Sequence, residues 1–191
     1  EDKRHILEMP PEELLRWFEE REEPSYRVDQ VLNWLYGKFA GSFEEMTNLS
    51  KDLRAALQES FEIGGLEVEE RAFSEDGLTE KFSFRLADGA LVESVSMQSE
   101  NGFTYCISSQ AGCPLNCAFC ATGAMGFGRN LRTHEILSQV LDMARAKGAL
   151  GNIDDVWEAN GFEGAHIGEA AELHKMDGTY RAVPLGSHQL N

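Results

Sequence analysis

The sequence predicts an α/β chain with three parts: a small N-terminal helical domain, a β-hairpin linker and the first part of an incomplete (β/α) barrel. Apolar residues recur at helical spacing over the first 60 residues and then alternate with polar residues at period two. A further strand then runs into a cysteine-rich loop and a helix, as in the first unit of an α/β barrel. We place the helical domain at 1–62, the hairpin linker at 63–101, the barrel start at 102–157 and an unassigned tail at 158–191.

Three apolar stripes predict the helices of the first domain. One helix begins at the pair Pro10 and Pro11, because proline suits the first turn of a helix. Ser42 and Glu45 have the spacing of a capping box. The apolar positions that form the stripes are Leu14, Leu15, Trp17, Phe18, Val28, Val31, Leu32, Leu35, Leu53, Leu57 and Phe61.

The hairpin consists of strands at 82–86 and 91–97 joined by a turn at 87–89. On the return strand Glu93 shares one face with three apolar residues, Leu91, Val95 and Met97. Burial on that face would raise the pKa of the Glu93 carboxyl and make it a better base near neutral pH. The alternative is an ordinary glutamate at the rim of the sheet.

The barrel start is predicted from a strand at 103–109, the cysteine loop, and a helix capped by Thr133 and closed at Lys147. A second strand is predicted at 152–157. Active-site loops of such barrels follow the carboxyl ends of the strands, which is where the cysteines lie.

Cys113, Cys117 and Cys120 form a C-x3-C-x2-C triplet. Thiolates are the usual ligands of [4Fe–4S] clusters, and three of them leave the fourth iron open. An open iron is what S-adenosylmethionine (SAM) needs in order to chelate the cluster. The alternative is structural zinc, which requires four closed ligands, and the sequence has no second C-x2-C. The triplet therefore predicts a radical SAM site.

The net charge of −16 argues against a general affinity for nucleic acid. Residues 102–147 are the exception, with four basic and two acidic side chains, so an anionic substrate could approach there. Three cysteines within eight residues do not form the spread pairs of a secreted disulfide framework. With no long apolar run and no signal-peptide pattern, the sequence predicts a cytoplasmic protein without a membrane segment. We expect a monomer.

The run from Cys106 to Gly123, CISSQAGCPLNCAFCATG, continues to Gly126-Phe127-Gly128-Arg129-Asn130-Leu131 and closely resembles the RlmN/Cfr family of radical SAM methyltransferases. Upstream, Trp34-Leu35-Tyr36 and the run from Ser42 to Ser50 resemble that family's accessory domain. The pattern at 126–131 is closer to the RlmN branch, which makes 2-methyladenosine in 23S rRNA and also acts on tRNA.

The resemblance implies a role for each predicted site residue. Cys113, Cys117 and Cys120 would ligate the [4Fe–4S] cluster, Cys106 would be the disulfide-forming cysteine that resolves the radical, and Glu93 would accept the proton. The cofactors would be the cluster and SAM, which together yield a 5′-deoxyadenosyl radical. The partners would be 23S rRNA, tRNA and an electron donor such as flavodoxin or ferredoxin.

The resemblance extends from about Met9 to Val156. The family's Gly-Met-Gly-Glu-Pro segment and its methyl-carrying cysteine are not found, and the residues from Trp157 onward read as unrelated sequence after a truncation or frame change. We therefore expect the 191-residue chain alone not to complete methyl transfer. Two alternatives stay open: a radical SAM enzyme with another substrate, and a non-catalytic remnant that binds a cluster or RNA.

Overall fold

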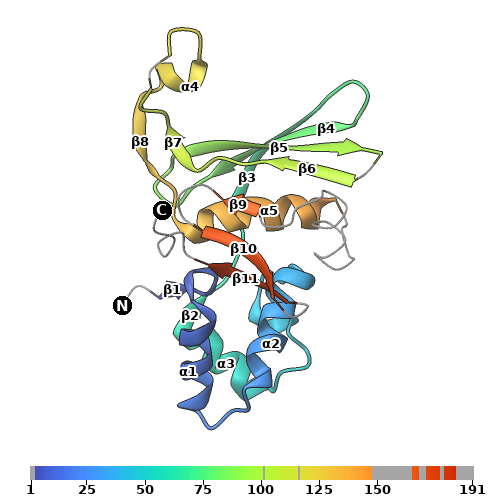
Figure 1. Ribbon diagram of the computed structural model, residues 1–191, viewed down its shortest axis with the longest axis vertical. Coiled ribbons are helices and arrows are strands. Elements are labelled where there is room, and N and C mark those ends of the chain that lie inside the picture. Colours follow the sequence, from blue (N-terminus) through green and yellow to red (C-terminus); the bar gives the residue numbers. More distant parts are fainter. Residues whose placement is uncertain are drawn as a thin grey trace, which may run out of the picture.

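The computed structural model describes residues 3–100, 102–115 and 117–147, together with the backbone of 165–167, 171–176 and 179–183. The predicted strand at 152–157 lies outside the described residues. A helical part, a twisted sheet and a long helix follow one another along the chain (Figure 1). The fold is mixed α/β, as the sequence predicts.

The helical part is built around one apolar core. Its elements are β1 (Arg4–His5), η1 (Ile6–Glu8), α1 (Pro11–Glu19), α2 (Tyr26–Leu32), the π-helical η2 (Asn33–Gly37), η3 (Phe43–Glu45), α3 (Lys51–Ser60) and β2 (Phe61–Glu62). Phe18, Val31 and Leu57 are completely buried in this core. Strands β1 and β2 pair in parallel and hold the two ends of the helical part together.

The predicted helix signals are present with small differences. Ser50 caps α3 by accepting a hydrogen bond from the amide of Leu53 at 3.1 Å. The Glu45 carboxylate reaches back to Ser42 Oγ at 3.2 Å, in the predicted pair. Phe61, which we expected on a helical stripe, instead lies in strand β2, where its side chain is still buried.

The second layer is a four-stranded antiparallel sheet in the order β3-β4-β5-β6. Its strands are β3 (Glu67–Phe73), β4 (Thr79–Arg85), β5 (Leu91–Ser99) and β6 (Gly102–Cys106). The predicted hairpin is confirmed as β4 and β5, with Phe84 opposite Val92. Phe82 and Phe84 are buried, and their rings stack at 5.7 Å between centroids. One face of the sheet is therefore covered, and it carries polar side chains beside these two rings.

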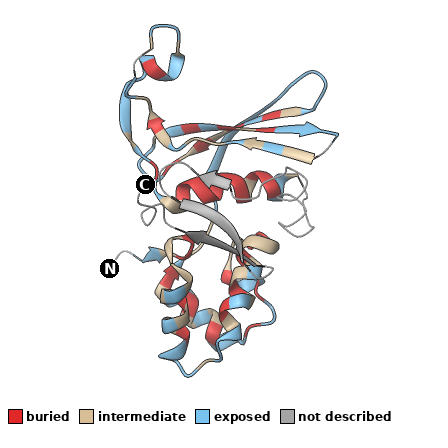
Figure 2. Ribbon diagram, in the orientation of Figure 1, coloured by how far each residue is buried: buried red, intermediate tan, exposed pale blue. Residues whose placement is uncertain are grey.

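The long helix α5 (Thr133–Ala146) is buried along most of its length (Figure 2). It begins at Thr133 with Arg132 as the N-cap, one residue earlier than a Thr133 cap would give, and the Glu135 carboxylate accepts the amide N–H of Arg132 at 2.7 Å. Its last residues lead to Lys147, as expected. None of the helices among the described residues has both the length and the apolar character that crossing a bilayer requires.

The predicted strand at 103–109 is formed only over its first part. Its first part is β6, which ends at Cys106 and pairs antiparallel with β5. After a break, β7 (Gln110–Gly112) pairs antiparallel with β8 (Phe127–Asn130), and the short helix α4 (Ala121–Ala124) lies between them. Within the described part of the chain, β6 thus extends the hairpin sheet, whereas β7, which leads to Cys113, belongs to a separate two-stranded sheet. A separate three-stranded antiparallel sheet has the order β11-β10-β9, formed by β9 (Ala165–Ile167), β10 (Ala171–Met176) and β11 (Thr179–Val183).

Candidate iron–sulfur site

The cysteine loop connects the paired strands β7 and β8. Figure 1 shows the loop projecting with α4 beyond the end of the main sheet. Its two ends meet where the amide of Cys113 donates to the carbonyl of Gly126 at 3.0 Å. Gly112 has a φ of +76°, and a Cβ at this position would overlap the Gly126 carbonyl oxygen. Only glycine lets the two backbones approach so closely, so the base of the loop is fixed by its sequence.

All four cysteines of the chain are free thiols. Cys113, Cys117 and Cys120 are half-buried, and the amide of Cys120 donates to the Cys117 carbonyl at 3.0 Å. Hydrogen bonds from the backbone of Gly123 and from Thr122 lower the pKa of the Cys120 thiol. Because the thiolate is the form that binds metal, this environment favours a ligand at Cys120.

The loop fits an iron–sulfur cluster in the chemistry of its donors. Three accessible thiols stand on one short segment, and none is consumed by a disulfide. Across the described ranges no group of three His, Cys, Asp or Glu side chains is gathered closely enough to hold a metal ion. The structure therefore supplies the three donors on a fixed base without bringing them to ligand distance.

The loop also presents large apolar side chains to solvent. Leu115 is 77% exposed, Phe119 93% and Met125 72%. Neighbouring Phe127 at the start of β8 is 48% exposed. This is a concentration of exposed apolar surface at the end of the molecule that carries the cysteines.

Cys106 and Glu93 lie on one face of the sheet. Cys106 ends β6 opposite Val95, and Glu93 shares the outward face of β5 with Val95. The carbonyl of Glu93 accepts a hydrogen bond from Ser108 Oγ at 2.7 Å, between Cys106 and the cysteine loop. The sheet thus places the two predicted residues beside the segment that leads to Cys113.

The expectation that Glu93 is desolvated is wrong for this structure. Its side chain is 61% exposed and forms an ion pair with Lys81 Nζ at 2.7 Å. The covered face of β5 carries instead Val92, Ser94 and Ser96. On β5 the outward face is thus the one with more apolar residues. The polar face can be buried because Gln139 on α5 accepts a hydrogen bond from Ser94. The disulfide implied for Cys106 is likewise not supported, since its thiol is free and exposed.

Two polar networks behind the loop were not predicted. Arg129 on β8 donates twice to Glu135 and once to Asp88 in the β4–β5 turn, each at 2.7 Å. Burial alone would raise the pKa of Glu135, but the bonds from Arg129 and the Arg132 amide outweigh it and lower the pKa. Gln139 on α5 binds the segment between β6 and β7. A lone Gln or Arg in a sequence gives no signal of such long-range pairing.

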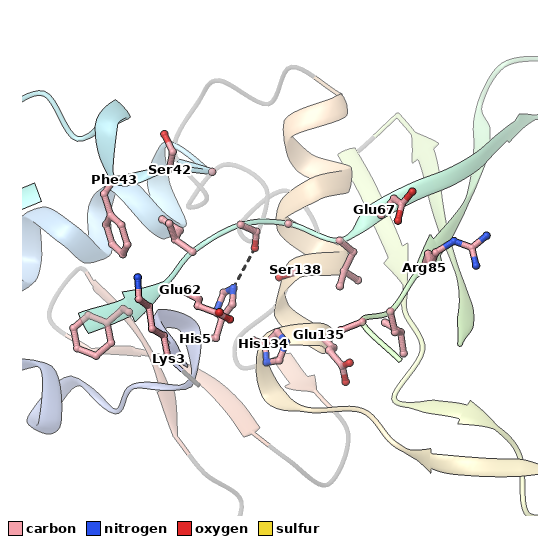
Figure 3. Close-up of a pocket in the computed structure, with 18 of the residues that line it drawn as sticks. Lys3, His5, Ser42, Phe43, Glu62, Glu67, Arg85, His134, Glu135 and Ser138 are labelled. Atoms are coloured by element: carbon pink, nitrogen blue, oxygen red, sulfur yellow. Dashed lines mark hydrogen bonds between the residues drawn. The ribbon is translucent and has the colours of Figure 1, made fainter. Parts of the chain in front are cut away.

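A cavity of about 880 Å³ lies between the helical part, the β2–β3 connection and α5 (Figure 3). His5 and His134 stack there at 4.6 Å between ring centroids, and His134 Nδ1 lies 2.7 Å from Glu8 Oε1. Burial and the nearby His134 lower the pKa of His5. None of the five predicted site residues lines this cavity, so it is separate from the cysteine loop.

Comparison with known proteins finds a family match for the helical part and a structural match for most of the chain. The family described as "Ribosomal RNA large subunit methyltransferase N-terminal domain" matches residues 5–63. A crystal structure of a radical SAM methyltransferase from Sphaerobacter thermophilus superposes with a TM-score of 0.70 at 35% identity. That match covers 78% of this chain and 44% of the other.

Curated relatives carry the name "Probable dual-specificity RNA methyltransferase RlmN". The protein of Gemmatimonas aurantiaca is 49% identical over 142 residues, which are 72% of this chain and 39% of the relative. The protein of Thermotoga neapolitana is 37% identical over 187 residues, which are 97% of this chain and 51% of the relative. The chain spans about half the length, or less, of these relatives. Over that span, the chain belongs to the RlmN family of radical SAM methyltransferases.

Proposed function

We propose that this chain is the cluster-binding part of a radical SAM RNA methyltransferase that acts on C2 of adenine in 23S rRNA and in tRNA. The observation that carries the proposal is the C-x3-C-x2-C triplet, whose three free thiols stand on one loop of a chain related to RlmN. Cys113, Cys117 and Cys120 would hold three irons of a [4Fe–4S] cluster and leave the fourth for SAM. This ligand set is our assignment.

When bound, the cluster and SAM supply the one-electron chemistry that turns SAM into a 5′-deoxyadenosyl radical. Adenine C2 is neither acidic nor nucleophilic, so a polar methyl transfer would fail there. In our proposal Cys106 acts as the resolving thiol and Glu93 takes the proton. Their common position on the outward face of β5 and β6 supports this pairing.

The proposal also specifies partners and surroundings. The adenine has to leave its stack to reach a site on a protein loop, as in other enzymes that modify bases. The electron would come from a small donor protein such as flavodoxin or ferredoxin. Free thiols are kept reduced in the cytoplasm, where we place this chain as a monomer.

Anaerobic reconstitution tests the cluster. The chain should bind roughly four irons and four sulfides and gain a broad thiolate-to-iron absorption. Cys113→Ala should abolish iron binding, whereas Cys106→Ala, at an exposed thiol outside the triplet, should leave it unchanged. Iron retained in Cys113→Ala together with stoichiometric zinc in the native chain would overturn the assignment.

Labelled SAM, a reductant and protein-free 23S rRNA test the substrate. The chain has four cysteines, and the proposal uses three as ligands and Cys106 as the resolving thiol. None is left to carry the methyl group, so the 191-residue polypeptide alone should release 5′-deoxyadenosine without methylating RNA. Formation of 2-methyladenosine above a Cys106→Ala control would show that the polypeptide is sufficient. Formation of 8-methyladenosine would contradict the C2 assignment.

A further inference from the structure

Gln139 is a fully buried amide on α5, and both polar atoms of its side chain are hydrogen-bonded. Its Oε1 accepts from the amide of Ser108 at 2.9 Å and from Ser94 Oγ at 2.6 Å. Its Nε2 donates to the carbonyl of Ser108 at 2.9 Å and to the carbonyl of Glu135 at 3.0 Å. One side chain therefore satisfies both the N–H and the C=O of a single residue in another element.

At Ser108 this pair of bonds takes the place of hydrogen bonds to a neighbouring strand. Ser108 lies in the break between β6, which ends at Cys106, and β7, which leads to Cys113. A primary amide presents an acceptor and a donor side by side, as a neighbouring strand would. The break is thus held to α5 by the side chain of Gln139 instead of by a ladder.

Ser108 transmits this anchoring to the predicted site. Its hydroxyl donates to the carbonyl of Glu93, so the same residue is tied to β5. Ser94, next to Glu93, is also bound by Gln139. The backbones of Cys106, Glu93 and the entry to the cysteine loop therefore share one buried anchor.

We propose that Gln139 is the positioning residue of this site, which fixes Ser108 and with it the spacing between Cys106 and the loop that begins at Cys113. The consequence for methyl transfer depends on the function proposed above. The anchoring itself does not, because it concerns only the backbone of Ser108.

Amide hydrogen exchange on the full chain without cluster or SAM tests the anchoring directly. In Gln139→Leu, which keeps the size but removes all four bonds, the Ser108 amide should exchange about ten- to a hundredfold faster. Ser138→Ala is the matched control, since Ser138 is buried on the same helix and its hydroxyl has no hydrogen-bond partner among the residues that the structure describes. It should leave Ser108 exchange unchanged.

Gln139→Glu separates this role from general packing. An ionised carboxylate accepts from the Ser108 amide but cannot donate to its carbonyl, whereas the protonated acid can do both. Burial raises the pKa of a carboxyl at this position, so protection of Ser108 should return on mild acidification. Gln139→Leu should show no such return.

A nitroxide on Cys106, with Cys113, Cys117 and Cys120 replaced by Ser, reports the position of the thiol itself. Its spectrum should be ordered with native Gln139, gain a mobile component in Gln139→Leu, and recover at low pH in Gln139→Glu. If Ser108 exchange and label mobility in Gln139→Leu match the Ser138→Ala control while circular dichroism shows a folded chain, the proposal is wrong. These measurements use no iron, so a failure to assemble a cluster would refute the proposed function and leave them standing.

Discussion

Replacing Arg129 with Met should destabilise the chain through the carboxylate it leaves behind. Glu135 is 3% exposed and accepts two bonds from Arg129 at 2.7 Å. Without these two bonds, the buried Glu135 carboxylate still accepts the Arg132 amide at the N-cap of α5, but it has lost its ion pair with Arg129. Removing one partner of a buried pair costs roughly 3–5 kcal/mol, and because the Arg129 side chain is 33% exposed we reduce this to about 2–4 kcal/mol.

Urea denaturation followed by circular dichroism measures this free energy of unfolding. Arg85→Met is the matched control, because Arg85 pairs with Glu69 at 2.6 Å with side chains 37% and 40% exposed. Such a surface pair contributes less than about 1 kcal/mol. Adding Glu135→Gln to Arg129→Met should restore part of the loss. Equal losses in the two Arg variants would refute the reasoning.

The same pair predicts a pH dependence. Desolvation raises the pKa of Glu135, but Arg129 holds it below its ordinary value of 4.5 in the native chain. A lowered pKa means that this stabilisation is present above the unfolded value and is lost as pH falls through the folded one. Without Arg129 desolvation dominates, the pKa rises, and stability falls as pH increases. The difference in free energy of unfolding between the native chain and Arg129→Met should therefore become smaller as pH is lowered toward about 4.

Two further outcomes concern the cysteine loop. Gly112→Ala should cost several kcal/mol, roughly the sum of left-handed strain and a clash with the Gly126 carbonyl. Gly77→Ala, with φ +70° and no described atom within 4 Å of the added Cβ, should cost about 1 kcal/mol of strain alone. Similar unfolding midpoints for the two variants would contradict the close approach of Gly112 to Gly126. The rate of Cys120 alkylation by iodoacetamide, mapped by mass spectrometry, should rise at a lower pH than for an ordinary thiol, because Gly123 and Thr122 lower the pKa of Cys120. A rate that rises at the pH of an ordinary thiol would contradict these hydrogen bonds.

The local elements could be predicted because their signals are local. The stripes through Phe18, Val31 and Leu57 give helices whose apolar faces meet in one core. The turn at 87–89 and the period-two pattern on both sides give the hairpin. Each of these features depends on residues that lie close together in the sequence.

The covered face of the sheet could not be predicted from the same pattern. Counting apolar residues on β5 favours Leu91, Val95 and Met97 as the inward face. The inward face is the one with Ser94, because Gln139, 45 positions away, supplies its partner. A polar residue is read as exposed unless its distant partner is known, and that pairing follows from the tertiary fold.

The orientation of β5 leads to a direct contrast between two glutamates. Glu93 points outward and pairs with Lys81 across the exposed face. Glu80 points inward from β4, is fully buried, and is paired with Arg71 and with Lys147 Nζ at 2.7 Å. Glu93→Gln should change the free energy of unfolding by less than about 0.5 kcal/mol, whereas Glu80→Gln should cost about 2–4 kcal/mol.

Urea denaturation of the two variants under the same conditions measures this contrast. A small effect at Glu93 would mean that the chain does not need this carboxylate for folding, which leaves the residue available for the role proposed above. Because the side chain is 61% exposed, a base at Glu93 would have to be desolvated by whatever covers the outward face during reaction, such as the unstacked adenine. A cost at Glu93 equal to that at Glu80 would show that the outward face is covered in solution and would reverse our assignment of the two faces.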